Sequence, residues 1–310
     1  PGIFMQMLWT TTLALLMLLA PGWALLGTSG IARRFSAFQR WCLALCFGAA
    51  FYPLLFYFAR LIPGLSLGRN KLAVILALCG LLILFFFRRD WKEQFQFDAG
   101  EIIGLSILLL TLFTRIWPLQ AYPFPAWSDS LHHTELTQLT AQQGRLPYDM
   151  QPYEPIPLGM YHLGLYALSG SFQILTGLPA HTALLYIAQL LNAFCVLGVY
   201  LALDRFFERK TALAGAVLVG LLSFQPAWYF NWGRFTQAAS QALLLPAWLL
   251  TVEAIQVFRE KRYWREKVGV VGAAALLTAA VFQLHFRVAG LYLPLLLVTG
   301  VVLLVQQLRA

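Results

Sequence analysis

Charged side chains are scarce in this sequence. Asp, Glu, Lys and Arg make up only 11% of the 310 residues, whereas a soluble globular domain has roughly 25%. Hydrophobic residues make up 60%, and the mean hydropathy is +0.69. The composition therefore excludes a soluble protein and indicates an integral membrane protein, with no appended soluble domain.

Common catalytic and metal-binding motifs are also missing. The four cysteines all lie in apolar runs without CxxC spacing: Cys42, Cys46, Cys79 and Cys195. We therefore expect buried, inert thiols and no cysteine-held metal. The sequence HHTE at residues 132–135 is not HExxH, which excludes the zinc-protease helix.

Apolar runs long enough to cross a bilayer predict nine membrane spans. They are residues 4–26, 41–62, 72–87, 102–121, 181–203, 211–230, 237–258, 268–284 and 289–305. The first run is too long for a signal peptide and lacks a basic leader. We predict an all-α polytopic helical protein with about nine transmembrane helices and two extracytoplasmic juxtamembrane helices. Residues 1–101 form an N-terminal unit of three spans, and residues 102–310 form a second module containing the loop 122–179.

The net charge is +9, and the basic residues are unevenly distributed between alternate loops. One set of loops holds 15 of the 22 Lys and Arg: Arg33, Arg34, Arg40, Arg88, Arg89, Lys92, Arg205, Arg209, Lys210, Arg259, Lys261, Arg262, Arg265, Lys267 and Arg309. Positively charged loops face the cytoplasm. We therefore attribute the excess of Lys and Arg to membrane topology and not to nucleic acid binding. The charge distribution predicts that the N-terminus, the loop 122–179 and the turns 231–236 and 285–287 are extracytoplasmic.

Polar functional groups are concentrated in residues 127–144, WSDSLHHTELTQLTAQQG. The stretch predicts a helix that starts at Ser128 or Asp129 and stops at Gly144. On such a helix Asp129, His132 and His133 share a face.

A second segment, residues 157–177, is apolar enough to be taken for a span. If it crossed, the later basic loops would face outward, against the charge distribution. Its scattered Tyr, His, Ser and Gln residues instead favour a helix lying at the membrane interface.

The order of these features resembles the GT-C superfamily of integral membrane glycosyltransferases. The resemblance rests on Asp129 in an outer-face amphipathic helix, the stop GRLP, the segment PIPLGMYHLGLYAL and a span ending in DRFFERK. It covers about residues 102–210 and is similar in order to the protein O-mannosyltransferase and aminoarabinose transferase branch. Three extra leading spans, and an SDS sequence with histidines in place of DxD or DE, suggest a divergent bacterial group.

The resemblance implies transfer of a sugar from a polyprenyl-phosphate donor to a glycan, lipid or protein hydroxyl. The reaction would invert the anomeric carbon, on the extracytoplasmic face of a bacterial plasma membrane. It implies that Asp129 is the catalytic base, although an aspartate at a helix start can also serve only as an N-cap.

The chemistry of this reaction selects the remaining candidate residues. Arginines on the same face could bind the departing phosphate, or could extend to the interface: Arg145, Arg234 and Arg287. Candidate substrate-binding residues are His132, His133, Tyr153, His162, Trp232 and His285. Trp232 could instead belong to an interfacial aromatic belt. His132, His133 and Glu135 could hold Mg, Mn or Zn together with Asp129, Asp149 or Glu154, and the selected set is Asp129, His133 and Glu154, although the histidines could also be solvated.

Two other classes of function stay open. A membrane transporter or flippase would use ionisable residues within spans, broken helices and often internal repeats, but charges within the runs are few and no half repeats. A structural or assembly protein would not need clustered Asp, His and Arg. The chain starts at Pro1 and stops just after an apolar run, which is typical of a fragment or processed form that has lost a C-terminal part.

Overall fold

The computed structural model of the protein describes residues 2–258 and 263–309, which form helices and no β-strand. Eight described helices are long and apolar enough to cross a membrane. They are α1 (Ile3–Ser29), α2 (Ala37–Leu61), α3 (Arg69–Phe87), α4 (Ala99–Ile116), α7 (Ala180–Phe206), α10 (Phe235–Val257), α11 (Trp264–Leu284) and α12 (Phe286–Arg309). The predicted all-α polytopic architecture is confirmed.

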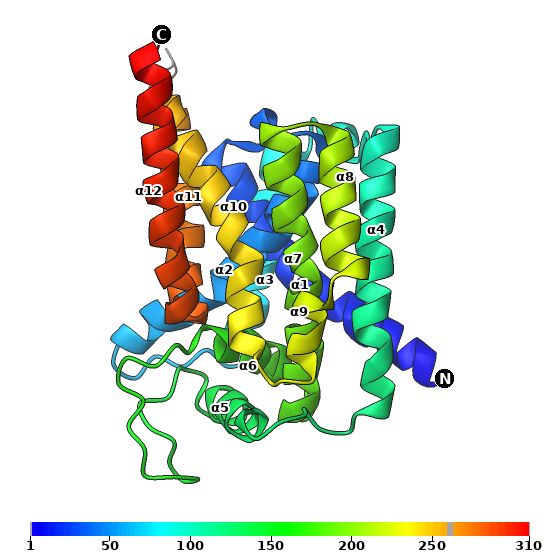
Figure 1. The fold of residues 1–310 in the computed structure, drawn as a ribbon. Coiled ribbons are helices and arrows are strands. Elements are labelled where there is room, and N and C mark those ends of the chain that lie inside the picture. Colours follow the sequence, from blue (N-terminus) through cyan, green and yellow to red (C-terminus); the bar gives the residue numbers. More distant parts are fainter. Residues whose placement is uncertain (1, 259–262, 310) are drawn as a thin grey trace.

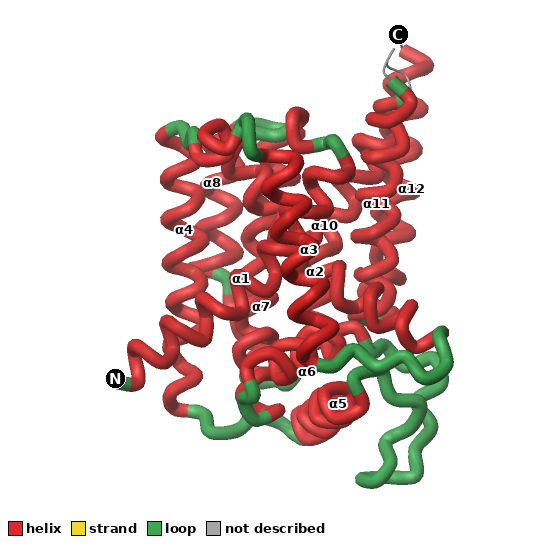
Figure 2. Tube along the Cα trace, turned by 180° about the vertical axis from the view of Figure 1, so that it is seen from behind, coloured by secondary structure: helices red, strands yellow, loops and turns green. Residues whose placement is uncertain are grey.

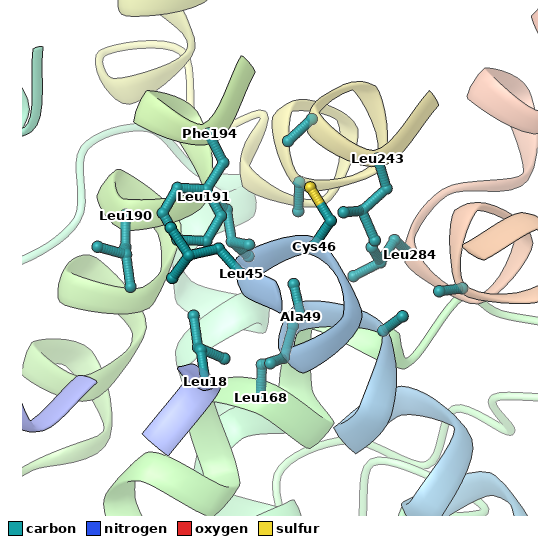
Figure 3. Packing of buried hydrophobic residues seen from close by; sticks show 14 of the residues in the cluster. Leu18, Leu45, Cys46, Ala49, Leu168, Leu190, Leu191, Phe194, Leu243 and Leu284 are labelled. Atoms are coloured by element: carbon teal, nitrogen blue, oxygen red, sulfur yellow. The ribbon is translucent and has the colours of Figure 1, made fainter. Parts of the chain in front are cut away.

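Helix α7 lies at the centre of the bundle. It packs against α2, α4, α10 and the following helix α8 (Arg209–Val217), and most of its length is buried. Figure 3 shows Leu45 and Cys46 of α2 between α7, with Leu191 and Phe194, and Leu243 of α10. All four cysteines are buried free thiols, as predicted. Helices α3 and α12 instead expose apolar side chains along most of their length, as lipid-facing helices do.

The sixth predicted span is broken. Its parts are α8 (Arg209–Val217), a π-helical turn η4 (Leu218–Leu222), α9 (Phe224–Ala227) and a 3₁₀ turn η5 (Trp228–Phe230). The two halves are bent by 52°, and together they are long and apolar enough for a ninth crossing. Pro226 explains the break, because a residue before proline avoids the helical region. Gln225 accordingly has an extended backbone with φ −97° and ψ 138°.

Arg115 of α4 and Asn192 of α7 bind the carbonyl groups that the break leaves free. The Arg115 guanidinium donates to the Gly220 carbonyl at 2.8 Å and to the Asn192 side-chain oxygen at 2.9 Å. The Asn192 amide donates to the Pro226 carbonyl at 2.7 Å. Backbone groups within a bilayer need protein partners, so these bonds allow the chain to bend there.

We expect Arg115→Leu to lower the thermal unfolding temperature of the purified protein in detergent. It leaves the Gly220 carbonyl and the Asn192 oxygen without their donor, at a cost of about 1–3 kcal/mol for an unsatisfied buried group. Arg88→Leu, at the exposed C-terminal end of α3, is the matched control and should leave the temperature unchanged. Equal unfolding temperatures for the two variants would contradict this role for Arg115.

The remaining helices, α5 (Asp129–Gln143) and α6 (Gly164–Thr176), lie together at one end of the bundle, at the bottom of Figures 1 and 2. We call this the α5 end. With 13 residues, α6 is about 20 Å long, too short to cross a hydrocarbon core of about 30 Å. The helix is covered by protein, because residues 164–172 are all buried between α5 and helices α2 and α7.

The opposite end carries the connections after α1, α3 and α7, where the basic residues gather; we call it the basic end. Glu253 of α10 is buried there and binds Arg34 and Arg205, each at 2.6 Å. Arg259, Lys261 and Arg262 of the predicted basic loops lie outside the described residues.

Candidate functional site at the α5 end

One face of helix α5 is polar and buried, and its contacts with α6 hold the helix in place. Thr137 hydrogen-bonds Ser169 of α6 at 2.8 Å, and Gly170 of α6 lies against Thr140 with no room for a side chain. The helix ends at Gly144, whose φ of 60° suits glycine. The predicted helix and its stop are therefore confirmed.

Asp129, at the start of α5, forms an ion pair with Arg234. The distance between Asp129 Oδ2 and an Arg234 guanidinium nitrogen is 3.2 Å. Both side chains are partly exposed, at 43% and 36%. The predicted N-cap bond is absent among the described hydrogen bonds of Ser128 and Asp129. The carboxylate is therefore oriented by Arg234, which comes from the turn before α10.

His133 ties α5 to that turn. Its Nε2 lies 3.1 Å from the Gly233 carbonyl, which can only accept, so Nε2 carries the proton. Nδ1 must then accept from the Tyr166 hydroxyl, 2.7 Å away. Burial raises the pKa of Tyr166 well above its ordinary value and lowers the pKa of His133 to about 4. His133 is thus a neutral, fully bonded residue that positions the neighbouring Arg234.

Gly233 allows the turn before α10 to lie close to α5. Its φ is 63°, and an added Cβ would meet Ser130 Oγ at 2.8 Å and Trp127 Cβ at 3.1 Å. A side chain at this position would push the turn away from α5 and separate Arg234 from Asp129.

Trp232 contacts Arg234 directly. The Arg234 guanidinium lies 5.0 Å from the centre of the Trp232 ring, and Tyr229 stacks on Trp232 with ring centres 6.2 Å apart. Two amide groups, from Gln237 and Gln241, donate to the Tyr229 hydroxyl. In this arrangement Trp232 supports the arginine, whereas the sequence suggested that it contacts substrate.

His162 and His285 form a second pair of buried histidines. Their ring centres are 4.5 Å apart, and each is less than a tenth exposed. Neither Nδ1 has a hydrogen-bond partner among the described residues. Burial lowers the pKa of His162 to about 3 and that of His285 to about 4. The charges of Arg287 and Arg234 lower the pKa of His285 further.

A cavity of about 490 Å³ opens beside these groups. It lies between α5, the loop 150–161 and Phe286. Tyr161 links the cavity to the ion pair: it lines the wall, and its pKa, raised mainly by burial, is also affected by the charges of Asp129 and Arg234.

Three potential metal ligands meet at the cavity. His132 Nδ1 lies 3.2 Å from Glu135 Oε2 and 3.9 Å from Glu154 Oε1, and one ligand atom from each residue lies within 4.8 Å of the others. All three residues belong to the wider group of predicted ligands, but the set differs from the selected one of Asp129, His133 and Glu154. Asp129 is paired with Arg234, and both nitrogens of His133 are occupied. Only Glu154 belongs to both sets.

Two predicted residues are not brought to this centre by any described contact. The Arg145 guanidinium lies 5.6 Å from the centre of the Tyr148 ring, which Arg60 also contacts. Tyr153 is exposed on the loop and does not line the cavity. In contrast, Asp129 pairs with Arg234 and His162 packs on His285, whereas Arg287 contacts Phe286. Tyr166 was not predicted, although its position four residues after His162 in a polar-dotted segment could have drawn attention to it.

Compared with protein-family models, curated proteins and solved structures, the chain matches none. Any assignment of function therefore depends on the site and on general chemistry.

Proposed function

We propose that the protein is an inverting glycosyltransferase. It would move a sugar from a polyprenyl-phosphate donor to an acceptor hydroxyl, with Asp129 as the base and Arg234 and Arg287 as ligands of the donor phosphate. The observation that carries the proposal is the ion pair between the Asp129 carboxylate and Arg234, at the end of a membrane-spanning helical bundle where a cavity also opens.

The ion pair between Asp129 and Arg234 suits this chemistry. A phosphate offers the arginine fork two oxygens and so competes with Asp129 for Arg234. Donor binding would thereby release the carboxylate to accept a proton. Asp129 then takes the proton from the acceptor hydroxyl as that oxygen attacks the anomeric carbon. The bond from this carbon to the phosphate oxygen breaks, and the phosphate leaves with the electron pair beside the arginines.

A divalent cation could also belong to the site. An imidazole and two carboxylates suit Mn or Zn, whereas Mg prefers oxygen ligands alone. His132, Glu135 and Glu154 would hold such an ion, which would act as a Lewis acid toward the donor phosphate. Among the described ion pairs, Glu135 and Glu154 contact only His132 and no Lys or Arg. A cation would therefore balance two neighbouring negative charges.

We expect the purified protein to bind Mn²⁺ or Zn²⁺, and Glu154→Gln to weaken that binding by about tenfold or more, as the loss of one charged ligand should. Isothermal titration of metal-stripped protein measures the affinity. Asp149→Asn, on the same loop but outside the ligand set, is the control. Equal affinity of wild type and Glu154→Gln would refute this metal site.

A transporter or flippase is the second candidate, because the broken span α8–α9 is a feature of transporters. One experiment separates the two. Purified protein in vesicles receives polyprenyl-phosphate donors with radiolabelled sugars, together with candidate acceptors. A glycosyltransferase releases polyprenyl phosphate and forms a labelled product. A flippase moves the intact donor across the membrane without cleaving it, and that result would overturn the proposal.

A further inference from the structure

Two adjoining cavities lie at the basic end, far along the bundle from α5. The larger, about 1020 Å³, has charged side chains in its wall and lies between the connection after α1, the connection after α3 and the start of α11. The smaller, about 220 Å³, is apolar and lies between α1, α2 and α11. Thr28 and Ser29 of α1 line both, so the two cavities adjoin at the end of α1.

One face of α11 forms a wall of both cavities. Arg265, Gly269, Gly272 and Leu276 are spaced four, three and four residues apart, so they follow one face of the helix. At Gly269 an added Cβ would lie 1.8 Å from the Ser29 carbonyl oxygen, so α1 and α11 touch there through their backbones. At Gly272 an added Cβ would meet nothing within 4 Å. The apolar cavity exists because this position lacks a side chain.

Two arginines stand at the polar end of this apolar groove. Arg33 lies four residues after Ser29, and Arg265 lies four residues before Gly269. Both are exposed and line the larger cavity, and neither belongs to an ion pair of the described residues. Arg34 differs, because it binds the buried Glu253.

Acidic side chains also line the larger cavity, but they are placed differently. Asp90 and Glu93 come from the connection between α3 and α4, which contributes no residue to the apolar groove. Glu266 contacts Arg34 at 3.5 Å. Because Glu266 is paired with Arg34, a ligand in the groove would meet Arg33 and Arg265 with its polar end.

We propose that a phospholipid with an anionic headgroup binds here, with its phosphate between Arg33 and Arg265 and one acyl chain in the groove beside Gly272. The two arginines and the apolar groove together indicate a lipid, because a soluble anion would bind the arginines and leave the groove empty. Basic pockets between membrane helices attract anionic lipids. This site is separate from the centre at the α5 end and does not depend on the proposed function.

Filling the groove gives the first test. Gly272→Phe adds a ring where there is open space, so the fold should tolerate it. Gly290→Phe in α12 is the matched control: an added Cβ there also meets nothing within 4 Å, and it lines neither cavity. The proteins are reconstituted in phosphatidylcholine vesicles containing phosphatidylglycerol, purified, and examined by native mass spectrometry for retained lipid. Wild type and Gly290→Phe should retain phosphatidylglycerol, whereas Gly272→Phe should lose it.

Removing the charges gives the second test. The double variant Arg33→Gln/Arg265→Gln should lower the preference for phosphatidylglycerol over phosphatidylcholine by about thirtyfold, given the usual strength of two arginine contacts with an anionic membrane lipid. Unchanged preference would overturn the proposal. So would retention by Gly272→Phe equal to wild type, or displacement of the lipid by inorganic phosphate alone, which would identify a site for soluble anions.

Discussion

Asp129→Asn should lower the rate of sugar transfer by about 10²- to 10⁴-fold, the usual contribution of a general base. The amide has nearly the same shape as the carboxylate but cannot accept the acceptor's proton. It also competes less well for Arg234, so donor binding should be unchanged or tighter. We therefore expect kcat to fall while KM for the donor stays constant or decreases. Transfer of radiolabelled sugar in vesicles measures both.

The control variant for this experiment changes Asp149, in the loop after α5. Asp149 is exposed and accepts only a local bond from the Gln151 backbone, so Asp149→Asn should retain full activity. Far-UV circular dichroism and the unfolding temperature report whether each variant is folded. A folded Asp129→Asn protein with wild-type kcat would show that Asp129 only orients Arg234.

The spans could be predicted from the sequence because bilayer thickness sets a minimum length for an apolar run. The break in the sixth span was visible as Pro226, but run length alone does not register it. Segment 157–177 was harder to interpret, because an apolar stretch can be buried by protein as well as by lipid. Some of its polar atoms are paired inside the bundle, as in the bond between Ser169 and Thr137, whereas Ser171 Oγ has no partner among the described residues.

The sequence indicates which residues belong to the site more readily than it indicates what each residue does. Neighbouring residues on a helix point about 100° apart, so His132 and His133 cannot act alike. His133 shares its face with Leu136, Thr137 and Thr140, which are all buried, and that spacing could have assigned it to the interior. The pairing of Asp129 with Arg234 joins residues far apart in the chain, and no local pattern encodes such a contact.

Acidification should unfold the α5 end through its three buried histidines. Their pKa values in the folded protein are about 4 for His133, 3 for His162 and 4 for His285, each lowered mainly by burial. In the unfolded chain a histidine has a pKa of about 6.5. Between these values the unfolded state binds more protons, so stability is complete above pH 6.5 and falls as the pH drops toward 4.

The slope of the free energy of unfolding against pH shows whether the buried histidines cause this loss of stability. Each histidine contributes up to about 1.4 kcal/mol per pH unit, so the three together contribute up to about 4 kcal/mol per pH unit. Unfolding temperatures in detergent between pH 7.5 and 4.5 measure the slope. His162→Gln and His285→Gln should each reduce it, because glutamine does not titrate, whereas His132→Gln, at a half-exposed position, is the control. If all three variants keep the wild-type slope, acid unfolding starts elsewhere, and the buried histidines do not limit the stability of the site.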